Sequence, residues 1–105
     1  MYGISSYYDI VSYVEQAVSE IAYDPYARAE YKDKIAEGKK RGVRDIRGWL
    51  ADELYNDSDV VNDLVGDQLY DLIVSTFGED PADKEVWAKH LAEMQKHLPH
   101  VTLRS

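Results

Sequence analysis

Hydrophobic residues recur at intervals of three and four along most of the chain, a spacing typical of helices with one buried face. In the first run they fall at Tyr7, Ile10, Val14, Val18 and Ile21. Comparable runs follow, and the predicted helices span about residues 7–22, 25–37, 43–55, 59–77 and 81–97. Alternation with a period of two never persists for five residues, so strands are not predicted.

Residues that cap or end helices separate these runs. The predicted caps are Ser5 or Ser6, Asp24, the 56–58 cluster and Asp80, and the predicted ends are Gly38, Gly78 and Pro99. Residues 98–105 follow the last predicted helix and are expected to form a flexible tail. The sequence therefore predicts a single all-α domain over residues 1–105, a compact bundle of four to five helices.

Composition narrows the class of protein. The chain has 105 residues, 45% of them hydrophobic, which suits one globular domain. It contains no cysteine, so disulfides, thiolate metal sites and cysteine nucleophiles are excluded. The formal charge of −8 disfavours direct binding to nucleic acid or anionic lipid. Without a long apolar run or a secretory leader, the chain is expected to be intracellular and to make no membrane contact.

The charges are strongly segregated along the chain. Residues 28–47 carry eight basic and four acidic residues, whereas residues 48–83 carry ten acidic residues and no Lys or Arg. Within the second segment an aspartate recurs every fourth residue, and we call the resulting set the acidic stripe: Asp59, Asp63, Asp67 and Asp71. On a helix each such step rises about 6 Å and turns about 40°, so the acidic stripe should extend about 18 Å along one face.

The acidic stripe is predicted to face water or a partner. The opposite side of the same helix is apolar and comprises Val61, Val65, Leu69, Leu72, Ile73 and Thr76. Like charges four residues apart repel, and Asp is a mediocre helix former, so local stability does not explain the pattern. Tyr70 and Val74 point towards the acidic side, as in an interface. Asp52, Glu53 and Asp57 complete the predicted partner-binding set. The alternative interpretation is a solvated face that promotes solubility.

In size, acidity, tyrosine content, predicted helicity and lack of cysteine, the chain resembles the small acidic anti-defence proteins of phages and plasmids. These include DNA-mimic anti-restriction proteins and anti-CRISPR proteins. The resemblance implies a stoichiometric inhibitor whose acidic face occludes the nucleic-acid site of a nuclease or CRISPR effector in the cytoplasm of a bacterial host. The expected partner is a basic nucleic-acid-binding protein. The basic segment 28–47 departs from the almost purely acidic composition of the most extreme mimics.

A second hypothesis is an adaptor or antitoxin-like regulatory module that binds one partner protein without mimicry. The nine tyrosines support it, because Tyr is favoured at interface hot spots. Tyr8 and Tyr13 lie outside the hydrophobic face of the first helix, where they form a second packing face or an interface that would allow a homodimer. A salt titration distinguishes the two hypotheses. Binding by charge mimicry should weaken steeply as salt is raised, whereas binding through an aromatic interface should not.

Other candidate chemistry is weakly represented. The basic cluster at residues 39–47 lacks the phosphate-loop pattern and a preceding strand, so we interpret it as a solvated loop. His90 and His97 are separated by about 10.5 Å of helical rise, which is too far to share one metal ion. No hydrolase motif is present. The sequence therefore predicts no enzymatic activity, no cofactor and no metal site.

Overall fold

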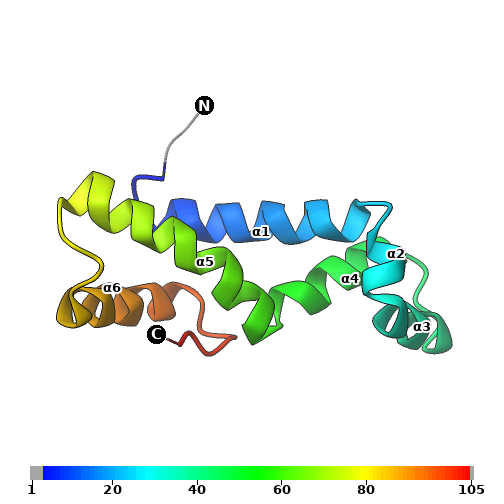
Figure 1. Cartoon of the computed structure of the whole chain (residues 1–105). Coiled ribbons are helices and arrows are strands. Elements are labelled where there is room, and N and C mark those ends of the chain that lie inside the picture. Colours follow the sequence, from blue (N-terminus) through cyan, green and yellow to red (C-terminus); the bar gives the residue numbers. More distant parts are fainter. Residues whose placement is uncertain (1–3, 105) are drawn as a thin grey trace.

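The described part of the chain, residues 4–104 of a computed structural model, consists of helices and connecting segments without a strand (Figure 1). The helices are α1 (Tyr7–Tyr23), α2 (Ala27–Glu30), α3 (Lys32–Lys40), α4 (Ile46–Tyr55), α5 (Ser58–Leu72), the π-helical turn η1 (Ile73–Phe77) and α6 (Lys84–His97). The predicted all-α class is confirmed. None of these helices combines the length and the apolar character that crossing a bilayer requires, among the residues described.

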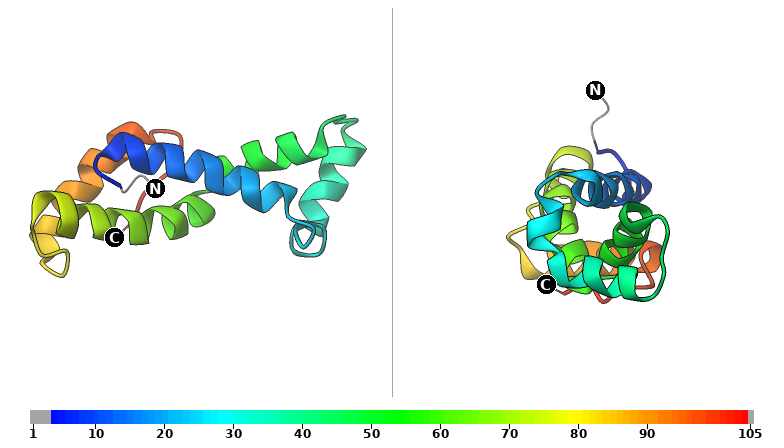
Figure 2. Two further views of the ribbon diagram at one scale, coloured as in Figure 1. Left: turned by 90° about the horizontal axis from the view of Figure 1, so that it is seen from above. Right: turned by 90° about the vertical axis from the view of Figure 1, so that its right-hand side faces the viewer.

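The helices form an elongated bundle of 47 × 29 × 20 Å. Helix α1 packs against α4 near one end of the molecule and against α5 and α6 near the other (Figures 1 and 2). Helix α3 packs on α4, so that α2 and α3 close the end that lies away from α6. The acidic helix α5 runs from the middle of the molecule, where it contacts α4, towards the end opposite α2 and α3 (Figure 1).

The core is built from the predicted helical faces. Helix α1 contributes Ile10, Val14, Val18 and Ala22, α4 contributes Leu50 and Leu54, and α5 contributes Val61, Val65, Leu69 and Leu72, all buried. Full burial of a Val or Leu side chain stabilises a fold by roughly 1.5–3 kcal/mol, so these three faces hold α1, α4 and α5 together.

Side chains cap the N-termini of the four longer helices. The Ser6 hydroxyl accepts from the Asp9 N–H at 3.2 Å at the start of α1, and the Asp45 carboxylate accepts from the Gly48 N–H at 3.0 Å in α4. The caps of α5 and α6 are Asp57 and Asp83. The 56–58 cluster was correctly predicted as a cap, but the predicted caps Asp24 and Asp80 are wrong. Each of these carboxylates closes a turn before the helix begins, since Asp24 accepts from the Tyr26 N–H and Asp80 from the Ala82 N–H.

The second predicted helix differs most from the structure. It is divided at Tyr31 into α2 and α3, and α3 continues through Gly38 to Lys40. Gly38 was predicted to end the helix, but it is buried there because the ring of Trp49 packs directly on it. Gly42, with φ of +80°, lies in the turn that follows. Helix α4 also begins at Ile46, three residues later than predicted.

The π-helical turn η1 changes the end of the predicted fourth helix. The Gly78 N–H bonds to the Ile73 carbonyl, and Gly78 adopts the left-handed conformation with φ of +63°. The wider turn shifts the helical phase, and Thr76, which was predicted on the apolar side of the helix, is exposed. Phe77 is thereby placed against the rings of Tyr7 and His90.

The predicted flexible tail is instead a packed segment as far as residue 104, while Ser105 lies outside the described residues. Leu98, Val101 and Leu103 are buried. The Gln95 side chain donates to the Leu98 and Val101 carbonyls and accepts from the Leu103 N–H, at 2.8–2.9 Å. The tail also bonds to α5 through Asn62. Apolar residues after the helix stop, together with these polar partners, hold the segment in place.

Candidate acidic interaction surface

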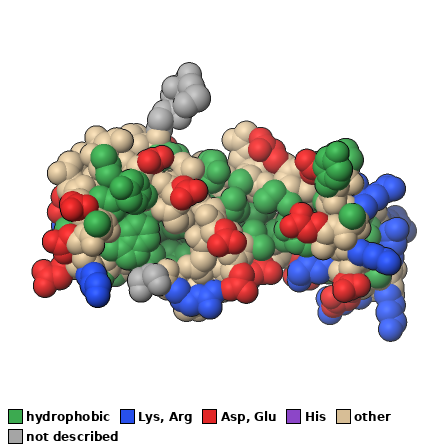
Figure 3. All heavy atoms as spheres, viewed as in Figure 1, with side chains coloured by type: hydrophobic (Ala, Val, Ile, Leu, Met, Phe, Trp, Pro, Cys, Tyr) green, Lys and Arg blue, Asp and Glu red, His purple; other side chains and the backbone are tan. Residues whose placement is uncertain are grey.

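The acidic stripe lies on one continuous helix. Helix α5 runs without interruption from Ser58 to Leu72, so all four aspartates keep α-helical spacing, and all four are exposed. In the space-filling view, acidic side chains form a diagonal row over α5 (Figure 3). The buried opposite face of α5 packs against α1 and α4, and this packing fixes the orientation of the row.

One member of the acidic stripe is neutralised within the chain. The Arg104 guanidinium forms an ion pair with the Asp59 carboxylate. Asp63, Asp67 and Asp71 have neither an ion pair nor a side-chain hydrogen bond among residues 4–104. The exposed, uncompensated part of the acidic stripe therefore consists of these three carboxylates, which span about 12 Å of helix.

The flanking predicted residues have different positions and roles. The Asp57 carboxylate is occupied as the α5 cap, accepting from the Asp59 N–H at 3.0 Å and the Val60 N–H at 3.3 Å. Asp52 belongs to α4 and lines a pocket of about 420 Å³ between α1 and α4. Glu53 is partly buried on the same helix. Only Asp52 and Glu53 thus remain as flanking carboxylates, on a helix other than α5.

Exposed apolar side chains continue the surface beyond the acidic stripe. Tyr70 is 53% exposed, Val74 46% and Phe77 45%. Tyr70 precedes Asp71 on α5, and the other two residues belong to η1. Hydrophobic atoms are visible beside the acidic row at this end of the molecule (Figure 3). Charged and apolar groups therefore adjoin on the candidate surface.

A hydrogen-bonded network near η1 was missed by the sequence analysis. His90 is only 3% exposed, and its Nδ1 lies 2.7 Å from the Tyr7 hydroxyl while its Nε2 lies 2.7 Å from Glu79 Oε1. The available signal was the position of His90, four residues before the buried Met94 on the same helix. The partners could not be read from the sequence, because Tyr7 is 83 residues away.

The hydrogen bonds from Tyr7 through His90 to Glu79 are connected as in a proton relay, but the pKa shifts of Tyr7 and Glu79 indicate a structural role. Burial first, then the charges of Glu93 and Glu79, raise the pKa of Tyr7. The hydrogen bonds from His90 and then Lys89 lower the pKa of Glu79. A raised pKa keeps the Tyr7 hydroxyl protonated and weakens it as a nucleophile. The network therefore ties α1 to α6 and to the segment after η1.

No cluster of three or more His, Asp or Glu side chains converges as a metal site within the described range. His97 contacts Tyr7 and Tyr8 instead, with ring centroids 5.6 and 4.6 Å apart. The aspartates of α5 radiate from a straight helix, whereas a bound cation needs converging oxygen ligands. The chemistry that this surface offers is therefore electrostatic and apolar contact.

Comparison with known proteins does not assign the chain to a family. No protein-family model matches it, and neither a curated protein nor a solved structure does.

Proposed function

We propose that this protein is a stoichiometric inhibitor of a nucleic-acid-binding nuclease of bacterial defence, a CRISPR effector or a restriction enzyme in the host cytoplasm. In this proposal the acidic stripe occupies part of the groove that holds nucleic acid. The observation that carries it is the row formed by Asp63, Asp67 and Asp71, exposed on one rigid helix and without an ion pair among residues 4–104.

The spacing of the carboxylates supports mimicry of a nucleic-acid strand. A strand of B-DNA presents one charge about every 3.4 Å of helix axis, and the acidic stripe presents one about every 6 Å. A groove lined by Lys and Arg would attract both, and steering by opposite charge gives fast association. The charges of the acidic stripe are more widely spaced than those of DNA. The stripe would therefore occupy only some of the positions at which the groove binds phosphates.

The energetic cost of the pattern also supports a role in binding. Each pair of aspartates four residues apart destabilises the helix by a few tenths of a kcal/mol. Asp59 is compensated by Arg104, but Asp67 has an aspartate on each side at this spacing. A solvated surface could alternate signs and avoid the repulsion, whereas a charge mimic requires the same sign throughout.

The adaptor hypothesis remains the second candidate because of the exposed apolar residues beside the acidic stripe. Tyr70, Val74 and Phe77 are each about half exposed, and Tyr is enriched at binding hot spots. In the inhibitor proposal these side chains supply the apolar contacts at the edge of the groove. In the adaptor hypothesis they supply most of the affinity.

The proposal is tested by titrating the protein into cleavage reactions of purified CRISPR and restriction nucleases. We expect inhibition of one nuclease to saturate near one protein per binding site and to weaken steeply with salt. The variant D63N/D67N/D71N should lose this inhibition, because the amides keep the size of the side chains and remove the three charges.

A matched variant controls for net charge. E20Q/D33N/E85Q removes three exposed charges from other helices, so it changes the net charge by the same amount. It should inhibit like the wild type. Equal inhibition by the D63N/D67N/D71N variant would contradict a role for the acidic stripe. Salt-resistant inhibition that is lost in Y70A/V74A would favour the aromatic interface instead.

A further inference from the structure

A basic pocket lies at the end of the molecule away from η1 and α6. It has a volume of about 550 Å³ and is formed by α2, α3 and the start of α4. Its lining includes five cationic residues, Arg28, Lys32, Lys39, Arg44 and Arg47, and one acidic residue, Asp45. The sequence predicts a solvated loop over residues 39–47, whereas in the structure Lys39 belongs to α3 and Arg47 to α4.

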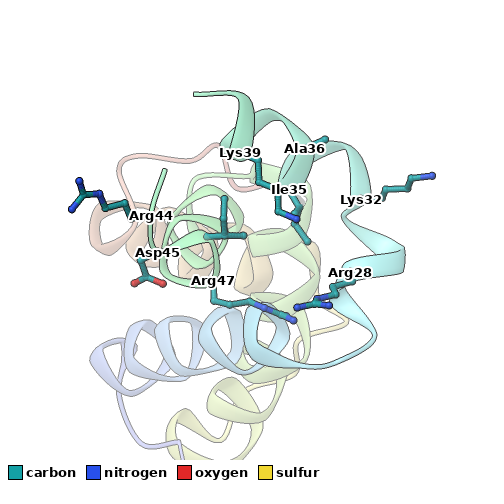
Figure 4. A pocket seen from close by; sticks show the side chains of 9 residues that line it. Arg28, Lys32, Ile35, Ala36, Lys39, Arg44, Asp45 and Arg47 are labelled. Carbon is teal, nitrogen blue, oxygen red and sulfur yellow. The ribbon is translucent and has the colours of Figure 1, made fainter. Parts of the chain in front are cut away.

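The cationic side chains are arranged in two groups (Figure 4). Arg28 and Arg47 extend towards one another along one edge of the pocket, and Lys39 lies beside Ile35. Lys32 and Arg44 extend away from the pocket. Three cations from three helices therefore face a shared space, and two others lie at its outside.

Arg47 is held in position by α1. Its Nη1 donates to the Ala22 carbonyl and, at 3.0 Å, to the Asp24 carbonyl, both at the C-terminal end of α1. These bonds use one of the three guanidinium nitrogens, so donors remain for a ligand. Carbonyl acceptors carry no full negative charge, and the positive charge of Arg47 is not neutralised by them.

The lining of the pocket keeps an excess of positive charge. None of the five cations forms an ion pair among residues 4–104, and Asp45, whose carboxylate caps α4, is the one acidic residue that faces them. Two guanidinium groups that approach one another repel unless an anion lies between them.

The floor of the pocket is apolar. Ile35, Ala36 and Ile46 line it between the cationic residues. A volume of this size is within the range of small-molecule sites, about 300–1,000 Å³, which combine apolar walls with a few orienting polar groups. A bare inorganic ion would leave this apolar surface uncovered.

We propose that the basic pocket binds a small organic phosphate monoester. The phosphate lies between Arg28 and Arg47, which can each donate two hydrogen bonds to its oxygens, and Lys39 adds a third positive charge. The apolar or planar part of the ligand covers Ile35 and Ile46. This site is separate from the acidic stripe and does not depend on the proposed inhibition.

The test is a titration of the full chain at low salt with adenosine monophosphate and with phenyl phosphate, followed by backbone NMR shifts. We expect both compounds to move the signals of Arg28, Ile35, Ile46 and Arg47. Inorganic phosphate and adenosine, which each lack one half of the ligand, should bind at least about tenfold more weakly. This corresponds to losing about 1.4 kcal/mol of contact.

Adjacent lysines on α3 provide a matched pair of variants. K39Q removes a charge that lines the pocket, and K40Q removes the same charge from the neighbouring exposed position, which does not line it. K39Q and R28Q should each weaken binding about tenfold, in line with the value of a charged hydrogen bond, while K40Q stays within about twofold. All three positions are exposed, so the fold should persist.

Equal losses in K39Q and K40Q would overturn the proposal, because a diffuse positive surface would then explain the binding. Equal affinity for inorganic phosphate and for the two organic phosphates would overturn it as well, as would the absence of binding by both organic compounds. The D63N/D67N/D71N variant should bind the organic phosphates at least as tightly as the wild type, so the failure of either proposal can be recognised separately.

Discussion

His90 connects three parts of the chain through one buried ring. Tyr7 from α1 lies on one side of the imidazole and Glu79 from the segment after η1 on the other, and the Phe77 ring lies with its centroid 4.5 Å away. Lys89 also forms an ion pair with Glu79, at 3.1 Å. Because these partners come from separate elements, the network orients η1 relative to α1 and α6.

The contact with Glu79 predicts a loss of stability in acid. The pKa of Glu79 is lowered by His90 and Lys89, so its contribution is present above the ordinary glutamate value of about 4.3. It is lost as pH falls through the lowered value in the folded state. E79Q should therefore lower the free energy of unfolding at pH 7. The further loss of stability between pH 7 and 3 should be smaller in E79Q than in the wild type, as measured by urea unfolding.

Glu15 provides the control for this measurement. It is exposed in the middle of α1 and has no ion pair among the described residues, so E15Q should leave the stability at pH 7 nearly unchanged. A decline in acid that is equally steep in E79Q and in the wild type would show that the Glu79 contact does not stabilise the fold. The pKa values of Asp9 and Glu93 are also lowered, so protonation of these two residues should still reduce the stability of every variant in acid.

Two glycines within helices should respond in opposite ways to the same substitution. At Gly66 in α5 an added Cβ meets no atom within 4 Å, so G66A should stabilise the protein by about 0.5–1 kcal/mol. At Gly38 in α3 the same atom would lie 2.9 Å from the Trp49 ring, so G38A should destabilise it by about 1–3 kcal/mol. Thermal or urea unfolding measures both effects. Stabilisation by G38A would contradict the close packing of α3 on α4.

At the scale of the element, the acidic stripe should reduce the stability of α5. The substitution D67K converts two repulsive pairs, with Asp63 and Asp71, into attractive ones. We expect a gain of roughly 0.5–1.5 kcal/mol in unfolding free energy at low salt, from a few tenths of a kcal/mol per repulsion removed and per attraction formed.

Salt provides the control for this prediction. The gain from D67K should shrink as sodium chloride is raised from about 0.05 to 0.5 M, because the pairs are exposed and screened. Urea unfolding at both salt concentrations measures it. A gain that is independent of salt would indicate helix propensity as the cause, and a loss would show that Asp67 has a stabilising contact.

The number and type of most elements could be predicted from the sequence because they depend on local patterns. Ser6 and the 56–58 cluster were recognised as caps, and the apolar spacing in α1 and α5 matches the buried faces. The failures have two causes. Gly38 continues a helix because Trp49, from another helix, covers it, whereas Thr76 is exposed because η1 locally changes the helical phase.

The candidate surface could be predicted only in part for the same reason. The exposure of the aspartates follows from the helical period, but the pairing of Asp59 with Arg104 requires the tail to return to α5. That return depends on burial of Val101 and Leu103 and on bonds from Gln95, which no pattern within the tail indicates. The basic pocket likewise requires α2, α3 and α4 to be brought together.

At the scale of the whole molecule, opposite charges occupy different ends of an elongated body. Basic side chains gather at the end formed by α2 and α3, and acidic ones extend along α5 (Figure 3). The longest dimension is 47 Å, several times the screening length of about 8 Å at physiological salt. The two ends can therefore act on different binding partners despite the net charge of −8.

The central claim is that the acidic stripe binds where a target protein holds nucleic acid. Its most direct test is capture from a bacterial lysate that contains CRISPR and restriction nucleases. Immobilised wild type, D63N/D67N/D71N and E20Q/D33N/E85Q are compared, with elution by duplex DNA at low salt. We predict that the wild type and the matched variant retain a nuclease that DNA releases, and that the D63N/D67N/D71N variant does not retain it. A partner that the D63N/D67N/D71N variant retains equally well, or that DNA fails to displace, would contradict the claim.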